Sequence, residues 1–189
     1  MAKRRKGKGK PGSSPNAPAK GGGTKKGSGP NTALILIAVA AAGLLAYFIF
    51  GLSGESTARS FPSQGNHHIS PGIDARFKYN SDPPTSGPHY SHRPPWGMHT
   101  RPLPKGLQIH GLEDGGVIVQ YNCTDCSSLI AKLRDIVSRF SEHVILAPYP
   151  TMKNRIALTA WTKLDTMEEF DENRIVRFIR AYKGIDHHR

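Results

Sequence analysis

Charged residues are absent from residues 33–52, which read ALILIAVAAAGLLAYFIFGL. A helix of about 20 residues rises about 30 Å, which matches the hydrocarbon core of a bilayer. The run therefore predicts a single transmembrane helix over 33–52. A cleaved signal peptide is the alternative, but the apolar region of a signal peptide spans only about 7–15 residues.

Acidic residues are absent from residues 1–32, where nine lysine or arginine residues lie. Basic flanks stay in the cytoplasm, so this pattern predicts a cytoplasmic tail and an extracytoplasmic C-terminal region at the cell membrane. The tail has almost no large apolar side chain, so we expect it to be disordered and to meet anionic membrane lipid. Residues 53–189 hold 17 basic and 14 acidic side chains, and this near balance argues against nucleic-acid binding.

Motifs of several common enzyme classes are absent as well. The chain has no Gly-x-Ser-x-Gly elbow, no phosphate-binding loop and no His-Glu-x-x-His helix. Glu113 and Asp114 are adjacent, and adjacent side chains on an extended segment point to opposite faces, which argues against a shared catalytic site. These absences favour binding over catalysis.

The region after the apolar run divides into a linker and one domain. Residues 53–66 are polar and predict a linker, and residues 67–189 are expected to form a single extracytoplasmic domain. Within that domain, residues 67–106 are rich in proline, histidine and glycine, and their aromatic residues give them groups to bury. We therefore expect an ordered, packed loop region there.

The remainder of the domain shows the periodicity of an α+β core. Apolar, β-branched runs predict strands, and apolar residues at helical spacing predict helices. The expected strands cover 116–121, 143–149 and 156–162, and the expected helices carry stripes from Leu129 to Phe140 and from Ile175 to Tyr182. The predicted order is β-α-β-β-α.

The two cysteines lie between a predicted strand and helix, in Cys123-Thr124-Asp125-Cys126. This spacing fits a structural disulfide, a thiolate metal site or a redox-active pair. An extracytoplasmic setting favours a disulfide, and a helix N-terminus favours a reactive thiolate. The order of elements resembles a thioredoxin-like fold. Asn122 replaces the tryptophan usual before the pair, a second crossover helix is lacking, and Pro150 imitates that fold's cis-proline only loosely.

Nine histidines give the sequence a second chemical signal. Imidazole, thiolate and thioether groups together favour copper, and then zinc. The candidate ligands are His89, His110, Cys123, Cys126, Met98 and His99. Glu113 is expected to contact these ligands and orient them without binding the metal itself. His187 and His188 are expected to be polar surface residues.

Several motifs resemble those of a bacterial membrane-anchored family of unknown function, numbered 3105. They are PPTSGPHY at 83–90, HGLEDGGV at 110–117, YNC at 121–123, APYP at 147–150 with Met152, and Ala160-Trp161. The resemblance covers about residues 67–185. The family's middle motif resembles His-x-Leu-Glu-His-Gly, so Asp114 stands where a second histidine is expected. If that histidine is a metal ligand, Asp114 has to replace it, or the site differs.

The family has no assigned activity, so the resemblance implies the extent and location of the domain rather than its chemistry. The sequence thus predicts a single-span membrane protein whose outer domain binds copper or zinc. A thiol–disulfide oxidoreductase that uses Cys123 and Cys126 is the alternative. A scaffold without a ligand is the third hypothesis, and the sequence indicates no protein partner.

Overall fold

A computed structural model describes residues 35–43 and 57–188. Residues 35–43 are helical, and the described residues include no helix long and apolar enough to cross a membrane. The structure thus contradicts the transmembrane helix predicted over 33–52: within the described residues, the helical part of this run covers 35–43. Residues 33, 34 and 44–52, like the basic tail, lie outside the described residues.

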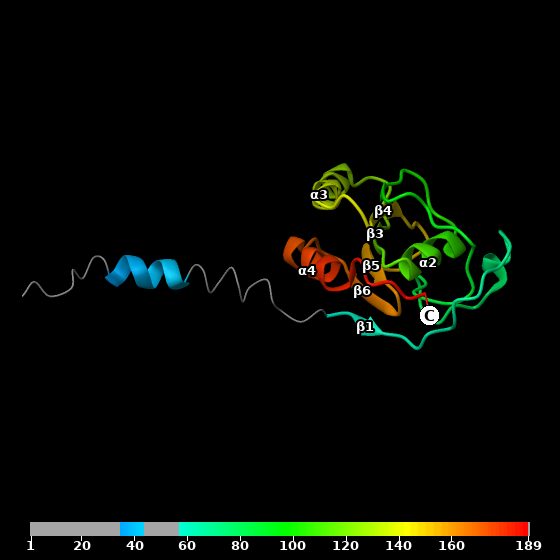
Figure 1. Cartoon of the computed structure of the whole chain (residues 1–189). Helices are drawn as coiled ribbons and strands as arrows, with labels where there is room; N and C mark the ends of the chain where they lie inside the picture. The colour runs from blue at the N-terminus through cyan, green and yellow to red at the C-terminus, as the bar shows by residue number, and fades with distance from the viewer. Residues whose placement is uncertain (1–34, 44–56, 189) are drawn as a thin grey trace, which may run out of the picture. The chain divides into compact units, whose positions relative to one another are not determined.

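The domain contains more elements than the sequence predicts (Figure 1). In chain order they are β1 (Arg59–Ser60), η1 (Asp74–Arg76), β2 (Gly97–Met98), α2 (Lys105–Glu113), β3 (Val117–Tyr121), α3 (Ser127–Ser138), β4 (Val144–Pro148), β5 (Ile156–Ala160), β6 (Lys163–Met167) and α4 (Glu172–Tyr182). The predicted β-α-β-β-α order corresponds to β3, α3, β4, β5 and α4. It is wrong as a description of the fold because it omits β1, β2, β6, η1 and α2.

The strands form one mixed sheet in the order β1-β6-β5-β3-β4-β2. The central strand β3 runs parallel to β4, with Val117 opposite Val144, and antiparallel to β5, with Tyr121 opposite Ile156. The segment from β4 to β5 passes the end of β3 and contains no helix. Among the described residues the cis peptide bond is Asp82–Pro83 rather than one at Pro150. The second crossover helix of a thioredoxin-like fold is therefore absent from the described residues, as the sequence indicated.

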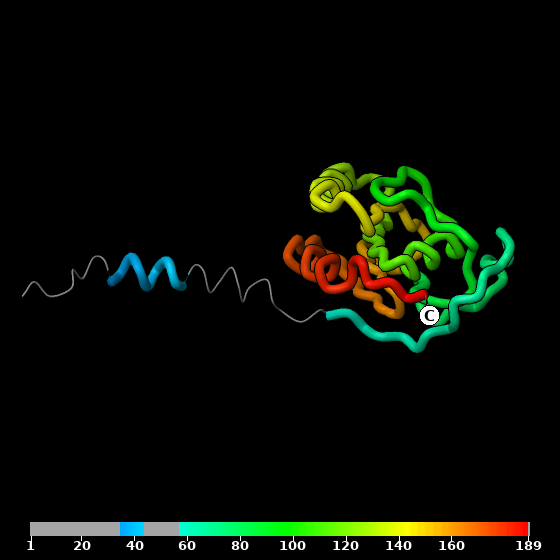
Figure 2. The backbone as a smooth tube through the Cα atoms, in the orientation of Figure 1, coloured from blue at the N-terminus to red at the C-terminus, as the bar shows by residue number. Residues whose placement is uncertain are grey.

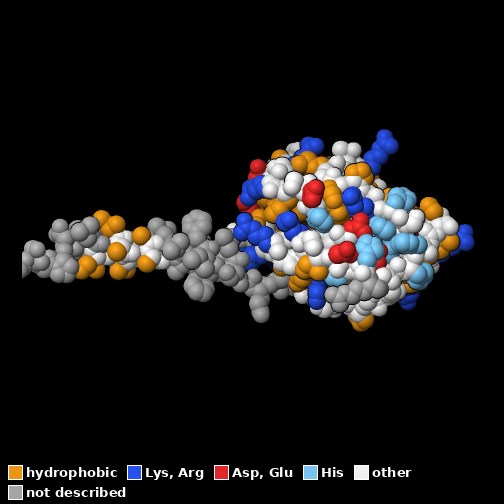
Figure 3. Space-filling model, viewed as in Figure 1, with side chains coloured by type: hydrophobic (Ala, Val, Ile, Leu, Met, Phe, Trp, Pro, Cys, Tyr) orange, Lys and Arg blue, Asp and Glu red, His pale blue; other side chains and the backbone are white. Residues whose placement is uncertain are grey.

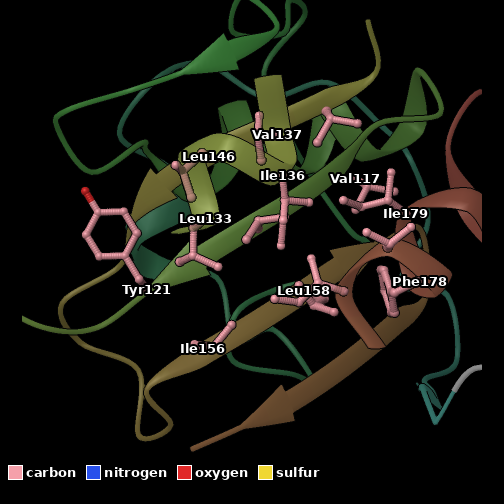
Figure 4. Close-up of a cluster of buried hydrophobic side chains, with 14 of the residues drawn as sticks. Val117, Tyr121, Leu133, Ile136, Val137, Leu146, Ile156, Leu158, Phe178 and Ile179 are labelled. Carbon is pink, nitrogen blue, oxygen red and sulfur yellow. The ribbon is translucent and has the colours of Figure 1, made fainter. Parts of the chain in front are cut away.

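Both faces of the sheet are covered by helices or loops. Because side chains alternate along a strand, Val117 and Val119 face the layer of α3 and α4, whereas Ile118 faces α2. The larger core lies on the α3 and α4 side, where Leu133, Ile136, Leu158, Phe178 and Ile179 are almost fully buried (Figure 4). All five residues of β3 are buried, as expected for a strand covered on both faces. The covered sheet gives the loops on the α2 side a rigid base.

Residues 57–66, expected to belong to the linker, lie against this domain. Arg59 and Ser60 pair with Leu164 and Lys163 of β6, and Phe61 packs against a small buried cluster. Thr57 donates a hydrogen bond to Asp165 at 2.7 Å. The folded region therefore begins before the loop region of residues 67–106.

Asp165 on β6 is the polar anchor of α4. Its side chain is 4% exposed and accepts hydrogen bonds from Thr57 and from Nε of Arg174, the latter at 2.8 Å. Burial alone would raise the pKa of Asp165, but these hydrogen bonds outweigh burial and hold the pKa below its usual value. The carboxylate is thus ionised in the folded protein at neutral pH and stabilises the contact between β6 and α4.

We predict that Asp165→Asn lowers the free energy of unfolding by about 2 kcal/mol at pH 7, because charged hydrogen bonds are lost. Urea denaturation followed by circular dichroism measures this loss. A group whose pKa is lowered on folding stabilises above its unfolded pKa, and that stabilisation disappears as pH falls through the folded value. The difference between parent and variant should therefore shrink below about pH 4. The exposed Asp125→Asn is the control, and equal stability of parent and Asp165→Asn at pH 7 would contradict the assignment.

Candidate metal centre

Two histidines from the loop region lie side by side because their backbones pair. His68 and His89 form an isolated parallel bridge, in which Ile69 N–H donates to the His89 carbonyl at 2.7 Å and His89 N–H donates to the His67 carbonyl at 3.1 Å. Their rings lie 5.2 Å apart. The His89 side chain is fully buried, and His68 is exposed. The pair therefore reaches from the interior of the domain to its surface.

The last turn of α2 supplies a second group of polar side chains. His110, Glu113 and Asp114 are spaced by three and four residues, so they share one side of the helix end. Gly115 and Gly116 then lead directly into β3. A Cβ atom on Gly116 would lie 2.3 Å from the carbonyl oxygen of Gly111, so only glycine permits this close packing of α2 against the strand.

The two groups converge with His188 from the C-terminal end of the described chain. Ligand atoms of His68, His89, His110 and Glu113 all lie within 4.8 Å of one another, and so do those of His110, Asp114 and His188. We call these six residues the histidine–carboxylate cluster. Histidine side chains gather beside carboxylates on the face shown in Figure 3. The cluster joins segments from both ends of the domain.

The two buried imidazoles of the cluster have the same pattern of hydrogen bonds. Nδ1 of His89 lies 2.8 Å from the Gly87 carbonyl oxygen, and Nδ1 of His110 lies 2.7 Å from the Tyr90 carbonyl oxygen. A carbonyl oxygen only accepts, so each Nδ1 carries the proton and donates. Each Nε2 faces a carboxylate instead: His89 lies 2.8 Å from Glu113 and His110 lies 3.5 Å from Asp114.

The electrostatics of the cluster favour a cation. Burial lowers the pKa of His110, so its imidazole is neutral near pH 7 and Nε2 offers a lone pair. The cluster lies at the C-terminal end of α2, where the helix dipole is negative. Arg93 balances part of the negative charge of Asp114, since Nε of Arg93 lies 3.1 Å from Oδ2 of Asp114. These groups could hold a metal ion through imidazole nitrogen and carboxylate oxygen.

The cysteines lie apart from this cluster and form a disulfide between Cys123 and Cys126. Glu113 precedes β3, whereas Cys123 follows it, and a five-residue strand spans about 16 Å. Disulfide sulfurs are not thiolates, so in this state they offer no ligand for the metal predicted from the sequence. Cys126 is buried against the core under α3.

Met98 and His99 are also outside the cluster. Met98 lies on the edge strand β2 and is 41% exposed, and Nε2 of His99 pairs with the carbonyl oxygen of Pro95 at 2.8 Å. Of the ligands predicted from the sequence, the structure brings together His89 and His110, with Glu113 beside them.

Three members of the cluster were not among the predicted ligands, namely His68, Asp114 and His188. His68 needs its backbone pairing with His89, which sequence spacing does not reveal. Asp114 could have been found from the sequence, because it stands where the family's motif has a histidine. His188 lies far from α2 in sequence, and its position near the C-terminus led to its assignment as a surface residue.

We predict that replacing both cysteines, Cys123→Ser with Cys126→Ser, leaves zinc affinity within about twofold, because β3 separates them from the cluster by about 16 Å. The free energy of unfolding of the same variant should be about 2 kcal/mol lower, because the unfolded chain gains entropy when the short disulfide loop is opened. Calorimetric zinc titration and urea denaturation measure the two effects. A tenfold loss of zinc affinity would place the sulfurs in the metal site.

Comparison with known proteins identifies a family for the whole domain. No curated protein and no solved structure matches the chain. The family model described as "Protein of unknown function (DUF3105)" matches residues 68–188, which include every member of the histidine–carboxylate cluster. The chain belongs to this family.

Proposed function

We propose that this domain binds a divalent first-row transition metal ion at the histidine–carboxylate cluster. The observation that supports the proposal is the hydrogen-bonding pattern that His89 and His110 share. Both rings donate Nδ1–H to a backbone carbonyl and direct Nε2 toward carboxylates. Metal-binding histidines are held in this way, because a fixed Nδ1–H sets the tautomer and leaves Nε2 free to bind.

The orientation also creates a need for a positive charge. A neutral imidazole with its proton on Nδ1 has a lone pair on Nε2, and a carboxylate oxygen likewise only accepts. Two acceptors that face each other in a buried site require a proton or a metal ion between them. The 2.8 Å gap between His89 and Glu113 suits a proton, whereas the 3.5 Å gap between His110 and Asp114 is too long for a hydrogen bond.

The donor types narrow the choice of ion. Imidazole suits zinc, copper, iron and nickel, whereas calcium and magnesium prefer sites made of oxygen alone. With thiolate and thioether groups outside the cluster, the argument for a soft copper(I) ion loses its basis. Zn²⁺ and Cu²⁺ are therefore the ions to test. Among divalent first-row ions, a site of nitrogen and oxygen donors binds Cu²⁺ most tightly.

We predict that the full chain binds Zn²⁺ with one-to-one stoichiometry in isothermal titration calorimetry, and that His110→Gln weakens binding at least tenfold. His110 is common to both groups of ligand atoms, so its loss removes a donor wherever the ion lies. His92→Gln is the control, because His92 is exposed and lies outside the cluster. The absence of zinc and copper binding by the parent, or equal binding by parent and His110→Gln, would refute the proposal.

Thiol–disulfide exchange is a second candidate function, and one observation favours it. The disulfide lies where α3 begins, with Cys126 as the N-cap, and Cys123 is the more exposed of the two residues. A helix N-terminus stabilises a thiolate at such a position. If this function is correct, the chain should catalyse insulin reduction by dithiothreitol, and Cys123→Ser should abolish that activity. Equal rates with and without the chain would exclude it.

The same disulfide supports a location in an oxidising compartment, which we propose for this domain. Disulfides persist outside the cytosol and are rare in reducing compartments. Labelling of thiols in intact cells before and after reduction tests this location. A fully reduced pair in untreated cells would contradict it.

A further inference from the structure

The C-terminal segment, residues 184–188, crosses the end of α2 and is held there by backbone contacts. Gly184 N–H donates to the Gly115 carbonyl at 2.7 Å, and His187 N–H donates to the Glu113 carbonyl at 2.9 Å. A Cβ atom on Gly115 would lie 2.8 Å from the backbone nitrogen of Ile185, so glycine at 115 permits the approach. Figure 2 shows this red segment leaving α4 and running past α2.

This path places one imidazole over the carboxylates of the cluster. Nε2 of His188 lies 3.3 Å from Oε2 of Glu113 and 3.4 Å from Oδ1 of Asp114. Nδ1 of His188 lies 2.7 Å from Oδ1 of Asp186, which fixes the ring with Nε2 turned inward. His188 thus has the same arrangement as His89 and His110, with Nδ1 held by an oxygen and Nε2 directed into the cluster.

Three separations among these atoms match those of a tetrahedral metal site. Donor atoms around a tetrahedral ion with bonds of about 2.0–2.1 Å lie about 3.3–3.4 Å apart. The separations are 3.3 Å for His188 to Glu113, 3.4 Å for His188 to Asp114, and 3.5 Å for His110 to Asp114. Nε2 of His89 and Oε2 of Glu113, at 2.8 Å, are too close to be two corners of such a site. His89 therefore does not bind the ion; a proton between its Nε2 and Oε2 of Glu113 holds the Glu113 side chain in place.

We propose that the ion lies between His110, Glu113, Asp114 and His188, and that its binding fixes the C-terminal segment against α2. This inference rests on the proposed metal binding and assigns its ligands. His188 and Asp114 are the more exposed ligands, with side chains 47% and 23% exposed, so the ion can enter from solvent on their side. Asp114 then has the ligand role that the resemblance suggested for a histidine.

Zinc titration of full-chain variants tests the ligand set. We expect His188→Ala and Asp114→Asn each to weaken Zn²⁺ binding at least tenfold. Ile185→Ala is the matched control within the segment, because its side chain is exposed, and it should change affinity less than threefold. His68→Ala should also change affinity less than threefold, because His68 is outside the proposed ligand set.

The outcomes separate this inference from the proposed function. If His68→Ala weakens binding tenfold and His188→Ala does not, the ion lies among His68, His89, His110 and Glu113, and the inference is wrong while metal binding stands. If the parent binds no zinc, both proposals fail.

Hydrogen exchange measures the coupling between the ion and the segment. Zn²⁺ should slow exchange of the Gly184 and His187 amides at least tenfold in the parent, because both amides bond to the end of α2. The His188→Ala variant, which lacks this ligand, should show no such slowing at the same zinc concentration. Equal exchange of these amides in the parent with and without zinc would overturn the coupling.

Discussion

The close contact between the end of α2 and the start of β3 is the constraint on which the candidate site depends. Gly116 allows the strand to begin against the Gly111 carbonyl, and Gly115 leaves room for the C-terminal segment. A side chain at 116 would meet Gly111 and the ring of Trp96, and α2 would have to move away from the sheet. His110, Glu113 and Asp114 would move with it. Two adjacent glycines thus determine where three of the six polar side chains lie.

The parts of the fold that the sequence predicted are those with clear periodicity. β3 alternates between two covered faces, and α4 has its apolar residues on one side, so both were recognisable. The α2 helix was missed because seven of its nine residues are buried, which leaves no polar face, and because it contains two glycines. β6 was missed because it contains Lys163 and a buried Asp165, whose partner Arg174 comes from α4.

The site was predictable only where its residues lie in local motifs. His89 lies in the motif PPTSGPHY and His110 in the motif HGLEDGGV, both of which are recognisable in the sequence. His68 joins the cluster because its backbone pairs with His89, and His188 joins because the neighbouring His187 N–H donates to the Glu113 carbonyl. Both contacts connect segments that are distant in sequence. The cysteines were grouped with the histidines because their ligand chemistry is similar, although the order of His110, β3 and Cys123 along the chain places them at opposite ends of the strand. β3 separates the sulfur chemistry from the imidazole chemistry.

The burial of His89 and Glu113 argues that this arrangement serves more than folding. Their side chains are 0% and 1% exposed, and both can carry charge. Removing such groups from water costs several kcal/mol per ion, and an apolar pair of similar volume would often stabilise the fold as well or better. Packing alone therefore does not require an imidazole and a carboxylate here. A carboxylate held rigidly by a buried histidine and turned toward His110, Asp114 and His188 is instead what a metal site requires of the groups around its ligands.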